Sequence, residues 1–264
     1  MNIIVCMKQV PDTEAKIKIL PDGAGIDAEG VKFVMNPYDE FAVEEALLIK
    51  EKFGGEVVIV CLGPDRSTEA IRTALAMGAD RGVHLNDAAF EGSDSYVTAK
   101  LLAKAIGEME YDIILAGKQA VDNDNAQVYA ALAELLDIPH ASVVTKLEIA
   151  EDGKSAVANR EIEGGAKEVI EIQLPAVIAA QKGLNEPRYA SLPGIMKAKR
   201  KEIKVLDLAA VGLDAGQVGA DGSKVKMSGF SLPPEREAGK VIEGEPEEQA
   251  AELVKLLREE AKAI

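Results

Sequence analysis

A run of polar side chains between Gly117 and Gln127 is the part of this sequence best suited to binding a small polar ligand. Its carboxylates can accept hydrogen bonds from ribose hydroxyls. Carboxylates on an Asn-rich loop serve better as acceptors than as an acid and base pair, so hydrogen bonding is the predicted chemistry. The polar residues of the run are Lys118, Gln119, Asp122, Asn123, Asp124, Asn125 and Gln127.

The elements on either side of this run place it at the edge of a sheet. Asp112 to Ala116 is almost wholly apolar, as in a strand buried on both faces, and Ala126 to Leu136 repeats apolar residues at helical spacing. Gly117 is expected to allow a sharp turn out of the strand. Ligands of open α/β sheets bind beyond the carboxyl ends of the strands, where free helix amides also bind phosphate. The loop is therefore a candidate nucleotide site, and the alternative is an ordinary turn whose Asp and Asn residues cap the helix.

The same alternation of strand and helix runs through the first 149 residues. Asn36 is the expected cap of one helix, with Pro37 in its first turn, and Lys16 to Val34 forms a hairpin-like excursion. This alternation predicts an α/β fold with a doubly wound, mostly parallel, Rossmann-like sheet of the kind that binds adenine nucleotides. Strands are predicted at Asn2 to Met7, Glu56 to Leu62 and Val83 to Leu85, and helices from Pro37 to Phe53, up to Gly78 and from Tyr96 to Met109.

The pattern changes after Pro139 to strands that are joined by short turns. The dipeptides Asp152-Gly153 and Gly164-Gly165 are typical of hairpins, so antiparallel strands should extend the sheet. A short helix is expected between Gly183 and Lys204. The predicted strands are Ala141 to Ile149, Ser155 to Ile162, Lys167 to Leu174 and the run AVIAA after Pro175.

We expect residues 1–205 to form a nucleotide-binding α/β domain and residues 206–264 to form an extended C-terminal arm. Leu206 to Gly244 is rich in Gly, Asp and Pro and shows no clear period, so it cannot bury enough apolar area to fold alone. Glu245 to Ala263 is an amphipathic helix. Such a helix needs a surface to pack on, either on its own domain or on a partner subunit.

The composition excludes several classes of protein. A net charge of −15 argues against a nucleic-acid or anionic-membrane binder, and no apolar run approaches the roughly 18 residues of a membrane span. Cys6 and Cys61 lie in apolar runs, which indicates buried free thiols in a reducing cytoplasm or organelle matrix. His84 and His140 lie far apart beside strand ends, so a structural role is expected for each, and no metal or hydrolase motif occurs.

One cluster of basic residues lies in this otherwise acidic chain. Two interpretations are open: the cluster steers an acidic partner, or it is a solvated helix end where cations favour the helix dipole. The residues are Lys197, Lys199, Arg200, Lys201 and Lys204.

These motifs resemble the beta subunits of electron transfer flavoproteins over nearly the full length of the chain. Ala158 to Ala179, ANREIEGGAKEVIEIQLPAVIA, matches the family pattern of a basic residue, an acidic-Gly-Gly turn, a following Glu and a Pro before an apolar strand. Four further segments look like family segments in family order: Met35 to Leu47, Arg72 to Gly82, Gly117 to Gln127 and Leu184 to Lys199.

The resemblance implies a heterodimer with an alpha subunit that holds most of an FAD, while beta buries an AMP of structural role. The low aromatic content, 4%, agrees with a flavin held partly by another chain. No residue of beta is implied to be catalytic. The implied nucleotide contacts are Cys6, Asn36, Pro37, Tyr38, Asp39, Leu62, Gly117, Lys118, Gln119, Ala120, Val121, Asp122, Asn123, Asp124, Asn125, Ala126, Gln127 and Val128.

The resemblance also implies a loop that docks onto an electron donor, with Leu192 as its apolar anchor between Pro187 and Pro193. The family accepts electrons from acyl-CoA or related dehydrogenases, as in fatty acid oxidation, and passes them to a quinone-linked oxidoreductase or another acceptor. The implied docking residues are Leu184, Asn185, Glu186, Pro187, Arg188, Tyr189, Leu192, Pro193, Met196 and Lys197.

Two alternatives follow from the same residues. Electron-bifurcating members carry a second FAD in place of AMP and use NADH; Asp87 to Ser95 and the Asp122-x-Asp124 spacing are similar to that branch. LNEPRYASLP is similar to the AMP branch, and so is Gln127 to Ala130, which lacks the Gly-Pro often seen there in bifurcating members; both segments favour AMP. A nucleotide-sensing regulatory module could use a similar sheet, whereas an adenylyl-transferring enzyme would need a Ser- and Gly-rich loop after the first strand, which CMKQVPDTE does not supply.

Overall fold

Strands and helices alternate through the first half of the chain, as the hydrophobic pattern predicts. The computed structural model describes residues 1–234 and 239–264. Its strands are β1 Asn2–Met7, β2 Gln9–Pro11, β3 Phe33–Met35, β4 Glu56–Leu62, β5 Arg81–Leu85, β6 Ile113–Gly117, β7 His140–Ile149, β8 Ser155–Glu161, β9 Lys167–Gln173, β10 Val177–Ala180 and β11 Ile203–Leu206. Its helices are α1 Pro37–Phe53, α2 Ser67–Met77, α3 Ser95–Gly107, α4 Val128–Leu136, α5 Leu192–Ala198, α6 Leu208–Val211, α7 Gly219–Gly222 and α8 Pro246–Glu259, with 3-10 turns η1 Ala88–Phe90, η2 Glu163–Gly165 and η3 Ala215–Gln217.

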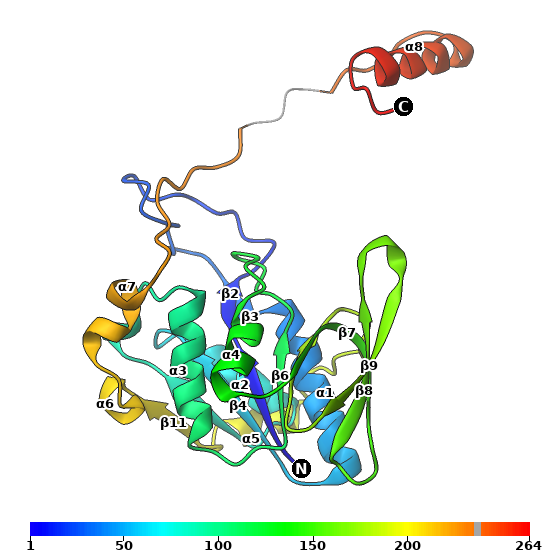
Figure 1. The fold of residues 1–264 in the computed structure, drawn as a ribbon. Helices are drawn as coiled ribbons and strands as arrows, with labels where there is room; N and C mark the ends of the chain where they lie inside the picture. Colours follow the sequence, from blue (N-terminus) through cyan, green and yellow to red (C-terminus); the bar gives the residue numbers. More distant parts are fainter. Residues whose placement is uncertain (235–238) are drawn as a thin grey trace. The chain divides into compact units, whose positions relative to one another are not determined.

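Within the described residues, one nine-stranded sheet has the order β11-β5-β4-β1-β6-β10-β7-β8-β9. Figure 1 shows β11 at the left of this sheet and β7, β8 and β9 at the right. The strands from β11 to β7 are all parallel to one another, whereas β8 is antiparallel to both β7 and β9. This confirms the predicted doubly wound sheet with an antiparallel extension. The small sheet of β2 and β3 and the Ile19–Ile26 bridge form the predicted excursion.

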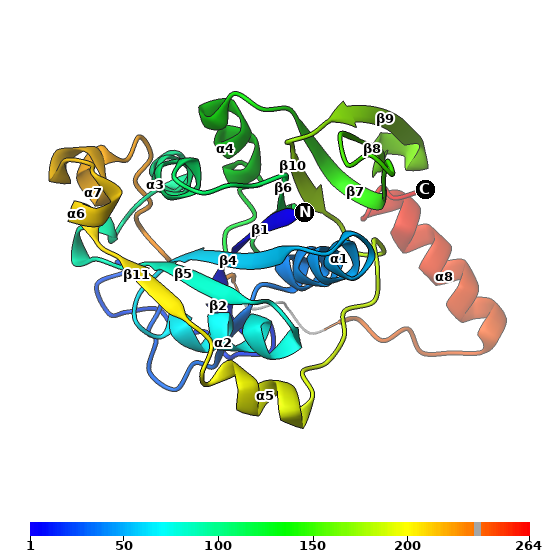
Figure 2. The same cartoon turned by 90° about the horizontal axis from the view of Figure 1, so that it is seen from below.

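Successive side chains of β1 pack on opposite faces of the sheet. Ile3 and Val5 lie in the core cluster that contains side chains of α1 and α2, whereas Ile4 and Cys6 lie in the cluster that contains side chains of α3 and α4. Figure 2 shows α2 and α5 on one side of the strands and α3 and α4 on the other. Burial of each Ile side chain stabilises the fold by roughly 1.5 to 3 kcal/mol. Because β1, β4 and β6 run parallel, their carboxyl ends lie at one common edge of the sheet, and the polar loop begins there.

The structure differs from the sequence prediction at two places near the candidate sites. Helix α4 begins at Val128, because Asp124 and Ala126 both have a φ of 51°, in the left-handed region that no helix accepts. Strand β11 was not predicted, and it pairs with β5 at the far edge of the sheet.

Two compact units divide the chain, Met1–Gly229 and Phe230–Ile264. The first unit includes residues 206–229, which the sequence assigned to the arm; Val211 and Val218 are buried there in the same core cluster as side chains of α3.

The second unit contains the predicted C-terminal helix, α8. It begins with Pro246 in its first turn and a capping box between Glu245 and Glu248. Among the residues described for this unit, no side chain of α8 is buried, so its own unit does not cover its amphipathic face. None of the helices in residues 1–234 and 239–264 combines the length and hydrophobicity of a bilayer-crossing segment.

Candidate functional site

The buried carboxylate of Asp39, in the first turn of α1, joins three segments at the carboxyl edge of the sheet. Its Oδ1 accepts hydrogen bonds from the backbone N–H of Gly117 at 3.0 Å and from Asn36 Nδ2 at 3.0 Å, and its Oδ2 accepts one from the backbone N–H of Lys8 at 2.7 Å. Desolvation raises the pKa of Asp39 to about 7, although the three donors oppose that rise. Asp39 thus ties the end of β1 and the end of β6 to the start of α1.

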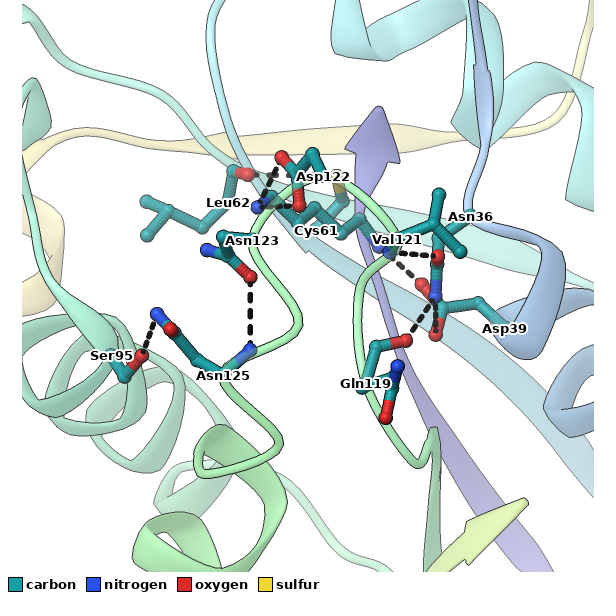
Figure 3. A network of polar contacts seen from close by, with 11 residues as sticks. Asn36, Asp39, Cys61, Leu62, Ser95, Gln119, Val121, Asp122, Asn123 and Asn125 are labelled. Carbon is teal, nitrogen blue, oxygen red and sulfur yellow. Dashed lines mark hydrogen bonds and ion pairs between the residues drawn. The ribbon is translucent and has the colours of Figure 1, made fainter. Parts of the chain in front are cut away.

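Asn36 holds the polar loop from the same helix end (Figure 3). Its Nδ2 donates to the carbonyl of Gln119 at 2.9 Å, and its Oδ1 accepts from the backbone N–H of Val121 at 3.1 Å. Asn36 is the N-cap residue of α1, as predicted, but among the described residues its side chain forms no capping hydrogen bond. Buried backbone groups of the loop need partners, and the Asn36 amide supplies both a donor and an acceptor to them.

Close packing requires the glycine at position 117. The prediction that Gly117 allows a sharp turn out of the strand is wrong. It is the last residue of β6, and its φ does not lie in the positive range that favours glycine. A Cβ placed there would overlap the carboxylate of Asp39 and lie 2.7 Å from the Cβ of Tyr38. Only a glycine lets α1 and β6 approach this closely.

The far side of the loop is tied to β1 and α3. Lys8 Nζ lies 2.6 Å from Asp122 Oδ2. Figure 3 shows Asn125 beside Ser95, where Asn125 Nδ2 donates to Ser95 Oγ at 3.1 Å. These contacts are exposed, so each contributes little to stability. Together with Asn36 they fix where the loop lies between α1 and α3.

Helix α4 has no side-chain cap, although four Asp and Asn residues precede it. The N-cap residue Gln127, which directly precedes α4, forms no side-chain capping hydrogen bond in the described residues. Asp122 pairs with Lys8, and Asp124 Oδ1 accepts from Gln119 Nε2 at 2.6 Å. The alternative that these residues merely cap the helix is therefore wrong, and no side chain in the described part of the chain caps the first turn of α4.

The structure brings the other residues of the predicted nucleotide site to the same edge. Cys6 and Leu62 lie at the carboxyl ends of the neighbouring strands β1 and β4, and Lys118 Nζ lies 5.0 Å from the ring centroid of Tyr38. Burial, followed by the charge of Asp39, raises the pKa of the Cys6 thiol. Pro37 is in the first turn of α1, and Ala120 accepts from the N–H of Asp124 in the loop.

The two cysteines and two histidines lie within strands, in β1, β4, β5 and β7. Both Cys6 and Cys61 are free and buried, as predicted. His84 is buried and its Nε2 lies 2.9 Å from the carbonyl of Gly63, whereas His140 is exposed with its ring 6.0 Å from that of Tyr129. No group of three or more His, Cys, Asp or Glu side chains in residues 1–234 and 239–264 could hold a metal ion.

The predicted docking segment exposes large apolar side chains. Tyr189 is 98% exposed, Leu192 74% and Met196 57%. Leu192 is the first residue of α5 and not part of a loop, because Ser191 caps the helix and Pro193 fits its first turn. Glu186, Pro193 and Lys197 are also exposed, Pro187 is half-buried, and Leu184 packs against the core.

Two residues of the docking segment and one of the basic cluster turn inward instead. Asn185 and Arg188 bind side chains of α1. Lys201 Nζ donates to the carbonyls of Leu75 and Ala79 at the end of α2. Lys201 is therefore a part-buried cation at the C-terminal end of α2, and neither interpretation of the cluster predicted this contact.

Sequence reasoning did not assign Lys8, Ser95 or Glu44 to either candidate site. Lys8 directly follows β1, and Ser95 opens the helix that follows β5. Both positions lie at the carboxyl edge of the sheet, where ligands of such sheets bind, so the sequence did indicate them as site residues. Glu44 gave no such signal, since it is one of several acids on α1.

Comparison with known proteins now identifies the family. A model described as "Electron transfer flavoprotein domain" matches residues 24–211. The electron transfer flavoprotein subunit beta of Bacillus subtilis is 46% identical over 265 residues, covering 100% of each chain. The proteins of the same name from Thermoanaerobacterium thermosaccharolyticum and Mus musculus are 43% identical (97% of this chain, 98% of that protein) and 41% identical (92% and 93%). These similarities, together with the α/β fold, show that this chain belongs to the family of electron transfer flavoprotein beta subunits, as its motifs predicted.

Proposed function

We propose that this chain pairs with an alpha subunit to form a heterodimeric electron carrier. The FAD is held mainly by alpha and is shared at the face of this chain, where it supplies the reversible redox chemistry. Two features support this division: aromatic residues make up only 4% of the sequence, and no Gly-x-Gly-x-x-Gly loop follows a strand. The name "subunit beta" of the relatives also supports it.

A structural AMP binds the loop from Gly117 to Val128 in this proposal. The observation that carries it is the uncapped start of α4, directly behind a loop rich in acceptors that contacts from α1, β1 and α3 hold in place. The N–H groups of the first turn suit a phosphate, and the Asn and Asp oxygens suit ribose hydroxyls. Cys6 and Leu62 border the same edge, and Asn36 and Asp39 act by positioning the loop.

The exposed face of Tyr189, Leu192 and Met196 docks onto the electron donor, an acyl-CoA or related dehydrogenase of fatty acid oxidation. Electrons then pass to a quinone-linked oxidoreductase or another acceptor. Tyr189 precedes a short capped helix that begins with the exposed Leu192, and an exposed Tyr is typical of residues that fill a pocket on a partner. The exposed cations Lys197, Lys199 and Arg200 lie beside them and favour association with an acidic partner.

Analysis of the bound nucleotides tests this proposal. The chain is co-expressed with its alpha subunit, the absorbance spectrum of the purified complex is recorded, and the released nucleotides are identified by mass spectrometry. We expect one FAD and one AMP for each heterodimer, and little flavin when beta is expressed alone. Two FAD for each dimer, reducible by NADH, would establish the bifurcating alternative, and a lone homodimer that binds ATP reversibly would establish the sensor.

A site variant locates the AMP within beta. Replacement of both Asn123 and Asn125 by Ala removes two loop amides, and we expect it to lower the AMP content without lowering the FAD content. Gln173→Ala, at an exposed position of β9, is the matched loss of an amide elsewhere and should leave both contents unchanged.

A further inference from the structure

The segment from Leu184 to Lys201 exposes apolar side chains but contributes little to the core. Ala198 is its one fully buried residue, whereas Tyr189, Leu192, Ile195 and Met196 are all exposed. A segment with so few buried apolar contacts is expected to open locally at low cost. Its conformation must therefore be fixed by polar contacts with other elements.

Glu44 of α1 holds the first part of the segment through Arg188. Arg188 Nε lies 3.1 and 2.9 Å from the two carboxylate oxygens, Nη2 lies 2.8 Å from Oε1, and the backbone N–H of Arg188 donates to Oε2 at 3.1 Å. Only 5% of the Glu44 side chain is exposed, compared with 57% of the side chain of Glu51, which also binds Arg188. The buried pair is thus the strong one: charge-assisted, bidentate and shielded from water.

A second contact lies beside the first on the same helix. Asn185 Nδ2 donates to Glu45 Oε2 at 2.9 Å and to the carbonyl of Phe41 at 3.0 Å. Both neighbours of this nitrogen are acceptors, which fixes the orientation of the amide. The chain just before the exposed Tyr189 is therefore bound to α1 at two points.

The end of the segment is bound to α2 by a reciprocal exchange. Arg72 Nη1 donates to the carbonyls of Ala198 and Lys201, while Lys201 Nζ donates to carbonyls at the end of α2. Gly194 lies so close to α2 that an added Cβ would overlap the carbonyl oxygen of Ala76. Both ends are thus held, and the apolar side chains of Tyr189, Leu192, Ile195 and Met196 between them are exposed to a partner.

We propose that Glu44 is a positioning residue for docking: it holds Arg188, and with it the turn from Tyr189 to Leu192, in the docking conformation before the dehydrogenase arrives. This inference rests on the docking role proposed above. A segment that is already ordered loses less entropy on association, so the partner binds at lower concentration. Removal of the Glu44 charge should therefore weaken docking without altering electron transfer in the formed complex.

The test uses the co-expressed heterodimer with Glu44→Gln, and Glu51→Gln as its matched control. The first variant removes the buried partner of Arg188, and the second removes the exposed one. Stopped-flow reduction of the flavin by the cognate dehydrogenase is measured against dehydrogenase concentration, and hydrogen exchange is followed by mass spectrometry in peptides covering residues 184–192.

With Glu44→Gln we expect the half-saturating concentration to rise about five- to tenfold, with the rate at saturation unchanged. Exchange in residues 184–192 should accelerate, while exchange in β1 and β6 and the flavin content stay as in wild type. Glu51→Gln should change the half-saturating concentration less than about twofold.

Different outcomes separate the inference from the proposed function. If Leu192→Ala has no effect on reduction, the docking face is elsewhere and both fail. If Leu192→Ala slows reduction but Glu44→Gln changes neither the half-saturating concentration nor the local exchange, only the inference is overturned. Faster exchange with unchanged docking also overturns it, because the order of the segment would then not matter.

Arg188→Gln breaks the same pair from the other side, and it replaces Glu44→Gln if that variant lowers the yield of the complex. The double variant Glu44→Gln with Arg188→Gln tests whether the two residues act as a pair, and it should weaken docking no more than the larger single effect. Additive effects of the two substitutions would mean that each residue acts separately, which contradicts the proposal.

Discussion

The carboxylate of Asp39 accepts the backbone N–H of Gly117 at 3.0 Å, which joins the first turn of α1 to the last residue of β6. The same carboxylate accepts the N–H of Lys8, just beyond β1. One buried acid thus fixes the carboxyl ends of two neighbouring parallel strands, and the polar loop leaves the sheet from one of them. The shape of the proposed nucleotide site depends on this contact, although no atom of Asp39 needs to touch the nucleotide.

Gly117→Ala should disrupt the site, because a Cβ there overlaps the Asp39 carboxylate and presses on Tyr38. Overpacking of a buried position costs about 1 to 3 kcal/mol, and the displaced carboxylate loses hydrogen bonds as well. We expect the AMP content of the heterodimer to fall and its thermal midpoint to drop by several degrees.

Gly107→Ala is the matched control for that substitution. Gly107 ends α3, and an added Cβ would meet no atom within 4 Å. We expect an unchanged or slightly higher midpoint and an unchanged AMP content. Equal nucleotide loss in both variants would show that the Gly117 contact is not what shapes the loop.

Asp39 should make stability depend on pH near neutrality. Burial raises its pKa from 3.8 to about 7, so between these values the folded protein binds a proton that the unfolded chain does not. The stability that this group contributes is fully present below about pH 4 and is lost as the pH rises through about 7.

The free energy of unfolding of wild type, relative to that of Asp39→Asn, should therefore fall by about 2 to 3 kcal/mol between pH 5 and pH 8. Chemical denaturation of the two heterodimers at equal concentration, at several pH values, measures this difference. Parallel curves for wild type and variant would mean that the carboxylate of Asp39 does not titrate in this range.

Sequence patterns predicted the elements of the sheet well, because each depends on a local signal. The run NIIVCM is apolar on both faces and must be central, and Asn36-Pro37 followed by acids marks the start of α1. The hairpins of β7 to β9 follow from their Gly-containing turns. These features needed no knowledge of distant residues.

The contacts of the candidate site depend on residues far apart in the sequence, and the sequence could not predict them. Asn36 has the type and position of a helix cap, yet its amide binds a loop more than 80 residues away. Arg188 belongs to a family docking segment, yet its guanidinium binds Glu44. In each case a buried polar side chain, Asn36 or Glu44, has a partner in a distant segment, and only the packed fold shows which segment that is.

Loss of α8 should weaken subunit association more than it disturbs the α/β unit. None of its residues is buried, and Leu253 and Val254 are 48% and 41% exposed, so the helix contributes no core that its removal would open. We expect deletion of residues 245–264 to raise the dissociation constant of the heterodimer by tenfold or more, as measured by analytical ultracentrifugation. The unfolding midpoint of isolated beta should shift by no more than about 2 °C.

Point variants on the two faces of α8 refine this prediction. Leu253→Ala with Leu257→Ala truncates the apolar face, whereas Glu252→Ala with Glu259→Ala changes the polar one. Only the first pair should weaken association. A truncated chain that pairs with alpha at full affinity would show that the helix is not part of the interface.

Leu192→Ala should slow electron transfer from the donor. Leu192 is 74% exposed at the start of α5, where Ser191 and Pro193 fix the backbone, so little entropy is lost when it enters a pocket. Truncation of such an anchor costs about 2 kcal/mol or more, and each 1.4 kcal/mol or so is a factor of about ten in affinity. Stopped-flow reduction by a subsaturating cognate dehydrogenase should therefore slow by roughly tenfold or more.

Flavin content, nucleotide content and chemical reduction by dithionite should stay unchanged in Leu192→Ala, since the residue lies in a segment apart from the polar loop. Leu135→Ala, at a position 43% exposed on α4, removes the same atoms from another surface and serves as the control. The adjoining cations act on the association rate, so raising the salt concentration should slow reduction of wild type and of Leu192→Ala by the same factor. An unaltered rate in Leu192→Ala would place the docking surface elsewhere on the heterodimer.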